Sequence, residues 1–180
     1  KGDVAAFADR IARPQHEVLS VLRAAALAQG KGTPWTMVWR ELAFAIGGGE
    51  VDLYDEIIGK MLQSPLAGYL MTDSENNDRV YRPRHERIRE VLEREPLLLL
   101  TRQRTLRARR VAEPVATVHA RIAAELASAA DEAPQWYARK YAVVHAAKGN
   151  SLTDETIPRS FLKWEASGQV RSLLGLPIQS

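Results

Sequence analysis

The sequence predicts one β-hairpin with helical segments before and after it. This order of elements restricts the possible folds more than any other feature. Residues 68–72 and 79–82 have the side chains of short strands, and the segment between them, 73–78, reads Asp-Ser-Glu-Asn-Asn-Asp. We predict two strands joined by a turn-rich loop over 73–78. Because an isolated hairpin is only marginally stable in water, helices must cover one of its faces.

Three helices are predicted before the hairpin and one after it, from apolar residues that recur at three- and four-residue steps. They cover residues 15–29, 33–46, 51–63 and 84–94. Thr33 is expected to cap the second helix, with Pro34 in its first turn. Trp35 and Trp39 are expected to pack together on the buried side of that helix. Three helices, a hairpin and a further helix describe a winged-helix module.

The rest of the chain is predicted to be helical, so the fold class is mainly α, a winged-helix module followed by a helical arm. One basic helix is expected over 97–110, another helix after Pro114, and a third from Pro134 to Gly149. Phe161, Leu162 and Trp164 and a last short helix would follow. We therefore predict a lead-in over 1–13, a winged-helix domain over 14–95 and a helical domain over 96–180.

The composition excludes several classes of site. The 180 residues include no cysteine, which excludes disulfides and thiolate metal ligands and favours a reducing compartment such as the cytoplasm. No stretch approaches the roughly 20 apolar residues of a membrane span. The chain starts at Lys1 rather than methionine, from which we expect an excised fragment of a larger protein.

Catalytic motifs are missing as well. Gly30-Lys31-Gly32-Thr33 has the letters of a phosphate loop, but it lacks the Gly-x-x-x-x-Gly-Lys-Ser/Thr order and a preceding strand. The four histidines show no His-x-x-x-His spacing, so a zinc site is not expected. A nucleophile elbow is absent too. We therefore expect no catalytic residue and no cofactor bound by this chain alone.

Arginines are concentrated between residues 82 and 110, where the sequence has ten arginines and only four glutamates. The simpler interpretation is a solvated surface paired with its own glutamates, and the alternative is a surface for nucleic acid or an acidic partner. Trp136 and Trp164 are further candidates for contacts with a neighbouring domain, since tryptophan is common at binding hot spots. The candidate interaction surface consists of Arg82, Arg84, Arg102, Arg104, Arg107, Arg109, Arg110, Trp136 and Trp164.

His85 follows the second predicted strand, at the start of the next helix. Read from the residues alone, it is a surface or capping histidine. Residues 14–92 nevertheless resemble the winged-helix domain of STAND-class signalling ATPases, which include the NACHT and apoptotic or plant-resistance ATPases, and large actinobacterial members above all. The likeness rests on Ala26-Leu27-Ala28-Gln29-Gly30-Lys31-Gly32-Thr33-Pro34-Trp35, Val38-Trp39, Leu42-Ala43, and Tyr81-Arg82 with His85. Residues 134–162 are similar to the helical region that often follows.

This resemblance implies a regulatory module that is not itself an enzyme. In that family an upstream domain binds ADP or ATP with Mg²⁺, the winged helix closes over the nucleotide, and a histidine at this position contacts the ADP phosphate. His85 would have that role here, although Arg84 and Glu86 replace the neighbours of the usual Met-His-Asp triplet. The implied partners are the upstream nucleotide-binding domain and downstream sensor repeats of the same chain, with homo-oligomers of the parent protein as a further option.

A DNA-binding winged helix is the alternative that the residues leave open. Such a module places one helix in the major groove and a basic wing on the backbone. The predicted third helix would be the reading helix, but it carries Asp52, Asp55 and Glu56 against Lys60, and the hairpin loop is acidic. Because these charges oppose phosphate, we expect DNA to be the less favoured partner. A small helical enzyme is the third possibility, for which we identify no site.

Overall fold

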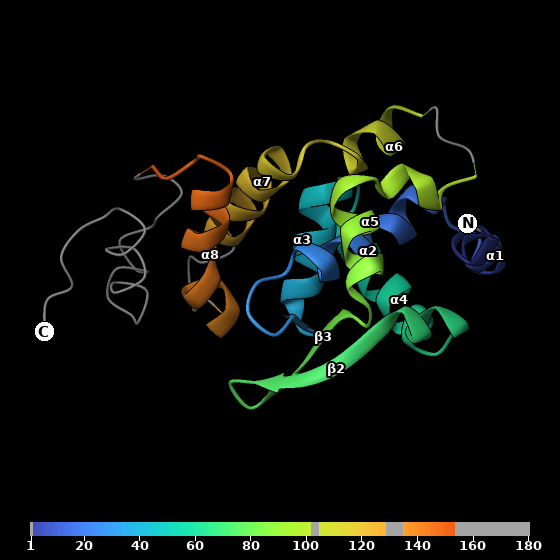
Figure 1. Cartoon of the computed structure of the whole chain (residues 1–180), viewed down its shortest axis with the longest axis horizontal. Helices are drawn as coiled ribbons and strands as arrows, with labels where there is room; N and C mark the ends of the chain where they lie inside the picture. Colours follow the sequence, from blue (N-terminus) through green and yellow to red (C-terminus); the bar gives the residue numbers. More distant parts are fainter. Residues whose placement is uncertain (1, 102–104, 129–134, 154–180) are drawn as a thin grey trace, which may run out of the picture. The chain divides into compact units, whose positions relative to one another are not determined.

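A computed structural model describes residues 2–101, 105–128 and 135–153 of the chain. The fold divides into two compact units, Lys1–Val115 and Ala116–Ser180. Both units are mainly helical, and the larger one also contains a small antiparallel sheet (Figure 1).

The larger unit is built around one helix, α2 (Gln15–Leu27), which is buried along almost its entire length. Its mixture of leucine, valine and alanine has few polar interruptions, which suits a helix that is covered on all sides. Helices α1 (Gly2–Arg10), α3 (Met37–Gly47), α4 (Val51–Leu62) and α5 (Glu86–Arg94) all contact it. The predicted helices over 15–29 and 51–63 are therefore present with nearly the expected bounds.

Three short strands complete a winged-helix layout, which confirms the predicted mainly-α fold class. They are β1 (Thr33–Pro34), β2 (Leu70–Glu75) and β3 (Asp78–Pro83), in the order β1-β3-β2 with both pairs antiparallel. A single 3₁₀ turn, η1 (Pro65–Tyr69), connects α4 to β2. Val80 and Tyr81 on the central strand β3 are both buried, and the Tyr81 ring packs on Trp39 of α3.

The hairpin turn is tighter than the predicted loop over 73–78. Glu75 pairs with Asp78 in the β2–β3 register, so only Asn76 and Asn77 lie between the strands. Both asparagines have positive φ, 52° and 64°. Asparagine tolerates this backbone region better than most residues, and a two-residue turn with both φ values positive has the twist that a hairpin needs. The predicted six-residue loop was therefore wrong, because most of its residues belong to the strands.

The expected cap at Thr33 was also wrong. Thr33 and Pro34 form strand β1, which pairs with Tyr81 and Val80, and α3 begins only at Met37. Thr36 is the actual N-cap, with its hydroxyl accepting a hydrogen bond from the Val38 amide at 3.3 Å. A proline is tolerated in β1 because this strand lies at the edge of the sheet.

The two tryptophans consequently have different surroundings. Trp39 is fully buried on α3, where its indole N–H donates to the Val21 carbonyl at 3.0 Å and its ring lies 5.1 Å from that of Tyr81. Trp35 precedes the helix and is 46% exposed. The predicted shared core face was therefore right for Trp39 and wrong for Trp35.

The expected single helix over 97–110 is not present. Pro96 begins a 3₁₀ turn, η2 (Pro96–Leu99), and the backbone is extended at Leu100. A separate helix, α6 (Leu106–Val111), begins after Thr105, whose hydroxyl accepts from the Ala108 amide at 3.1 Å. Proline at the start of η2 and a capping threonine at the start of α6 explain the interruption.

Arg23 ties these later segments to the winged helix. Arg23 is a residue of α2, and its side chain is buried. The guanidinium donates to the carbonyls of Leu92 (3.0 Å) and Glu93 (2.9 Å) at the end of α5. It also donates to the carbonyls of Val111 and Glu113, at the end of α6. Through these bonds the larger unit extends past residue 95, the predicted end of the winged-helix domain, to Val115.

In the smaller unit the described helices are α7 (Val115–Ser128), which begins at the last residue of the larger unit, and α8 (Trp136–Lys148). Val118, Ile122 and Leu126 form the buried stripe of α7, the helix predicted after Pro114. A Cβ on Gly149, just after α8, would clash with the backbone of Ala120 on α7, so glycine is required at this close approach. The predictions for Pro134, Phe161, Leu162 and Trp164 lie outside the described residues.

Candidate functional site at the β3–α5 corner

His85 lies at the N-cap of α5, immediately after the sheet. Its backbone is extended (φ −121°, ψ 140°), and its carbonyl accepts the amides of Ile88 and Arg89 at 3.0 and 3.1 Å. The imidazole is exposed and makes no capping hydrogen bond. Strand β3 and helix α5 therefore hold the backbone of His85 firmly, while the side chain is available to an external group.

A polar cavity of about 140 Å³ lies beside this corner, between the end of α2 and the start of α5. Arg82, Glu86 and Arg89 supply its charged groups, and the loop after α2 contributes Gln29, Gly30 and Gly32. His85 precedes Glu86 in the chain but is not one of the residues that line the cavity. The structure therefore brings Arg82 into the cavity wall and places His85 next to it.

Ion pairs already engage the cations of this cavity. The Arg89 Nε donates to Glu93 at 2.8 Å, and this bond raises the pKa of the guanidinium. Arg82 lies 3.5 Å from the carboxylate of Asp73, which Lys31 also approaches at 3.7 Å. The pKa of Asp73 is lowered, first by the amide of Ser74 and then by these two cations. The corner thus has a balanced set of charges that an anionic ligand would have to rearrange.

The remaining arginines of the candidate interaction surface lie in two different places. Arg84 donates to the Leu70 carbonyl at 3.3 Å and so joins the end of β3 to the start of β2. Arg107, Arg109 and Arg110 are on α6. Arg102 and Arg104 lie outside the described residues. The arginines that cluster in the sequence therefore do not form one continuous described surface.

Arg110 has a structural role that the sequence did not reveal. Its Nη2 lies 3.5 Å from the Ala45 carbonyl in the last turn of α3, and its Nε is close to Gly48, just past the end of that helix. A cation at a helix C-terminus interacts favourably with the helix dipole. Part of the arginine run therefore stabilises the junction of α3 and α6.

Helix α4, the element that would read DNA in a winged-helix regulator, exposes carboxylates. The side chain of Asp52 is 85% exposed, and Arg40 binds both Asp52 and Asp55, at 3.0 and 2.8 Å. Glu56 pairs with Lys60 on the same helix. Three carboxylates against two cations leave this face negative, as the sequence predicted, and oppose the approach of phosphates.

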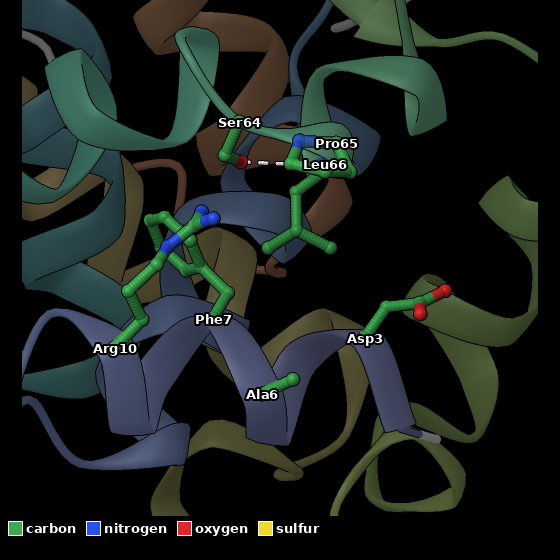
Figure 2. Close-up of a pocket in the computed structure, with 7 residues that line it drawn as sticks. All are labelled: Asp3, Ala6, Phe7, Arg10, Ser64, Pro65 and Leu66. Carbon is green, nitrogen blue, oxygen red and sulfur yellow. Dashed lines mark hydrogen bonds between the residues drawn. The ribbon is translucent and has the colours of Figure 1, made fainter.

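A second, smaller cavity of about 110 Å³ lies between α1 and η1 (Figure 2). Figure 2 shows Asp3 at one end of it and Arg10 beside the Phe7 ring at the other, with the apolar side chain of Leu66 between them. Arg10 lies 5.4 Å from the centre of the Phe7 ring. Asp3 accepts a 2.6 Å hydrogen bond from the hydroxyl of Tyr69, which raises the pKa of that tyrosine. These contacts attach α1 to the winged helix.

The smaller unit contains a buried histidine pair that sequence analysis missed. The Nδ1 atoms of His119 on α7 and His145 on α8 are 2.8 Å apart, and the hydroxyl of Tyr137 lies 3.0 Å from the Nε2 of His145. Burial lowers the pKa of His145 well below its usual value, and His119 and Lys148 add to this shift. No sequence motif marks the pair, because the two residues come from different helices.

Trp136 is partly exposed at the start of α8, and its ring lies 5.9 Å from that of Tyr137 and 6.5 Å from that of Tyr141. Trp164 lies outside the described residues. In the part of the chain that the structure describes, no three histidine, aspartate or glutamate side chains are grouped so that they could hold a metal ion. Among the same residues, no helix has the length and apolar character needed to cross a membrane.

No protein-family model, no curated protein and no solved structure matches this chain.

Proposed function

We propose that this chain is a non-catalytic regulatory module of a larger, cytoplasmic STAND-type signalling ATPase. In this proposal its winged helix closes over ADP or ATP with Mg²⁺ held by an upstream domain, and its helical part leads to a downstream sensor. The observation that carries the proposal is the β3–α5 corner, where the imidazole of His85 is exposed and unbonded beside a cavity that contains Arg82 and Arg89.

The chemistry of this corner is suited to recognising a phosphate rather than to catalysing its transfer. An imidazole N–H at an exposed helix N-cap is free to donate to a phosphate oxygen, and such a bond is stronger when one partner is charged. A contact made only in the closed state would shift the equilibrium toward that state.

Replacing His85 by alanine in the parent protein tests this proposal. The variant is expected to retain less ADP through purification and to have a higher basal activity than the unchanged protein. The matched control is Arg87→Ala, since Arg87 is on the same helix with its side chain 88% exposed. Equal ADP content and equal basal activity in the two variants would refute the phosphate contact of His85.

DNA binding is the second candidate function, and the acidic face of α4 argues against it. Fluorescence anisotropy of this chain with labelled duplex DNA, at low and near-physiological salt, separates the two functions. We expect binding to be absent, or to disappear as salt rises, because only non-specific contacts with arginine would contribute. Salt-resistant binding would favour the DNA-binding function instead, and Arg107 and Arg109 would then be the first residues to replace.

A further inference from the structure

The larger unit has three places where large apolar side chains remain in contact with water, and one of them is Leu98 on η2, which is 44% exposed. Trp35 and Met37, at the start of α3, are 46% and 48% exposed. Leu106, the first residue of α6, is 81% exposed. Contiguous apolar patches with a polar rim mark surfaces that bind another protein, and tryptophan and arginine are enriched among the residues that dominate such binding.

The first surface, which we call the indole face, consists of Trp35, Met37, Asp52, Asp55 and Glu56. The edge of the Trp35 ring lies on Gly59 of α4, with its Cζ2 atom 3.6 Å from the place where a Cβ would be. Glycine is unfavourable inside a helix, and here its lack of a side chain lets the indole lie against α4.

The charge on the indole face is negative. Asp55 and Glu56 are one helical turn from Gly59, so they lie on the same side of α4 as the indole. Asp52 and Asp55 share the single guanidinium of Arg40. One carboxylate charge is therefore in excess beside Trp35, and the matching partner surface is apolar and basic.

The second surface, which we call the α6 face, is both apolar and basic. It consists of Leu106, Arg107 and Arg109, all of them exposed. Within the described part of the chain, neither Arg107 nor Arg109 forms an ion pair. This sets them apart from Arg82 and Arg89, whose charges are paired with neighbouring carboxylates.

We propose that the α6 face of one molecule docks on the indole face of a second copy of this chain. Leu106 would contact Trp35 and Met37, and Arg107 and Arg109 would approach the carboxylates of the indole face. Figure 1 shows the ribbon of α6 at one end of the larger unit and that of α4 toward the hairpin end, and the guanidinium of Arg107 reaches Gly49, just before α4. The contact between two copies joins two different surfaces, so each added copy leaves one face of each kind open. The proposal does not depend on the function proposed above.

Charge reversal on each face, followed by mixing, tests this contact. The weight-average mass of the 180-residue chain is measured by sedimentation over a range of concentrations for the unchanged protein, for Asp52→Lys and for the double variant Arg107→Glu with Arg109→Glu, which reverses both cations of the α6 face. The unchanged chain should associate as concentration rises. Each variant alone should associate at least ~10-fold more weakly, because both of its faces then carry the same sign of charge. Arg87→Glu on α5 is the matched control and should behave like the unchanged chain.

The decisive sample is an equimolar mixture of Asp52→Lys and the double variant Arg107→Glu with Arg109→Glu. Each reversed face then meets a face of opposite charge on the other variant, so association should return to near the level of the unchanged chain. Circular dichroism of each variant confirms that the fold is intact. Three results would overturn the proposal: an unchanged chain that stays monomeric at the highest concentration, a mixture that fails to associate, or an Arg87→Glu control that associates as weakly as the two test variants.

Discussion

At the scale of single residues, Gly32 shows how one backbone position restricts the whole corner. Its φ is +138°, and a Cβ built on it would clash with the carbonyl of Tyr81 on β3. The Tyr81 carbonyl carbon would lie only 2.8 Å from that Cβ, and this neighbour is backbone that cannot rotate away. Glycine is therefore required for β1 to pair with β3 and for the adjacent cavity to keep its shape.

We predict that Gly32→Ala lowers the free energy of unfolding of the larger unit by about 2 kcal/mol or more, from backbone strain together with the clash. Chemical denaturation followed by tryptophan fluorescence measures this loss, with Trp136 and Trp164 replaced by phenylalanine in every variant so that the signal comes from Trp35 and Trp39 of the larger unit. Gly68→Ala is the matched control, because a Cβ there meets nothing within 4 Å, and its unfolding free energy should change little. Equal stabilities of the two variants would show that β1 shifts to accommodate the methyl group.

Arg23 and the histidine pair show which residues single-sequence reasoning does not identify. In the sequence Arg23 is one polar residue within an apolar stretch, yet it is 1% exposed and binds the ends of α5 and α6. His119 and His145 are separated by 26 positions and meet only because α7 packs on α8. Contacts of this kind depend on tertiary packing, which leaves no periodic pattern in the sequence.

At the scale of elements, the sequence was informative where periodicity was long and ambiguous where it was short. The stripes of α2, α4 and α7 span several turns. Helices α2 and α4 were predicted nearly to their bounds, and α7 was predicted as a helix after Pro114. Thr33-Pro34 has the residue types of both a helix start and an edge strand, and only the close approach of β3 decides between them. The hairpin was identified, but its loop was overestimated because asparagine permits a two-residue turn.

The candidate site was predictable only in part. The order of β3 and α5 placed His85 at a helix start, and the structure has it there as the N-cap. The cavity beside it was not predictable, since it requires the end of α2 to face Arg82 and Arg89. The arginine run was interpreted as one surface, whereas its members separate into a sheet corner and α6 because Pro96 and Thr105 interrupt the predicted helix.

At the scale of the whole molecule, the two compact units bury different kinds of ionisable side chain. The larger unit buries Arg23, which donates to four backbone carbonyls, and these bonds are present at any physiological pH because arginine does not lose its proton. The smaller unit buries two imidazoles that share one short N···N contact. One imidazole must donate and the other accept, so this contact requires at least one of the two rings to be neutral.

This difference predicts that the smaller unit loses stability before the larger unit as the pH falls. The pKa of His145 is lowered in the folded chain by burial, and then by His119 and Lys148. Above the unfolded-state pKa of about 6.5 the neutral ring fits its site, and the stability from this group is fully present. As pH falls below that value the unfolded state takes up protons more readily, and this stability is progressively lost.

Hydrogen exchange at pH 7.5 and 5.5, corrected for the intrinsic exchange rate, measures the effect on both units in one sample. Amides of α7 and α8 should lose more protection at pH 5.5 than amides of α2. The partly buried His16 on α2, whose pKa is also lowered, first of all by burial, makes the comparison stringent, because acid should weaken the larger unit to some extent as well. Protection of α7 and α8 that falls no more than that of α2 would show that the histidine pair takes up a proton without opening, and that its site adjusts to the charge within the folded state.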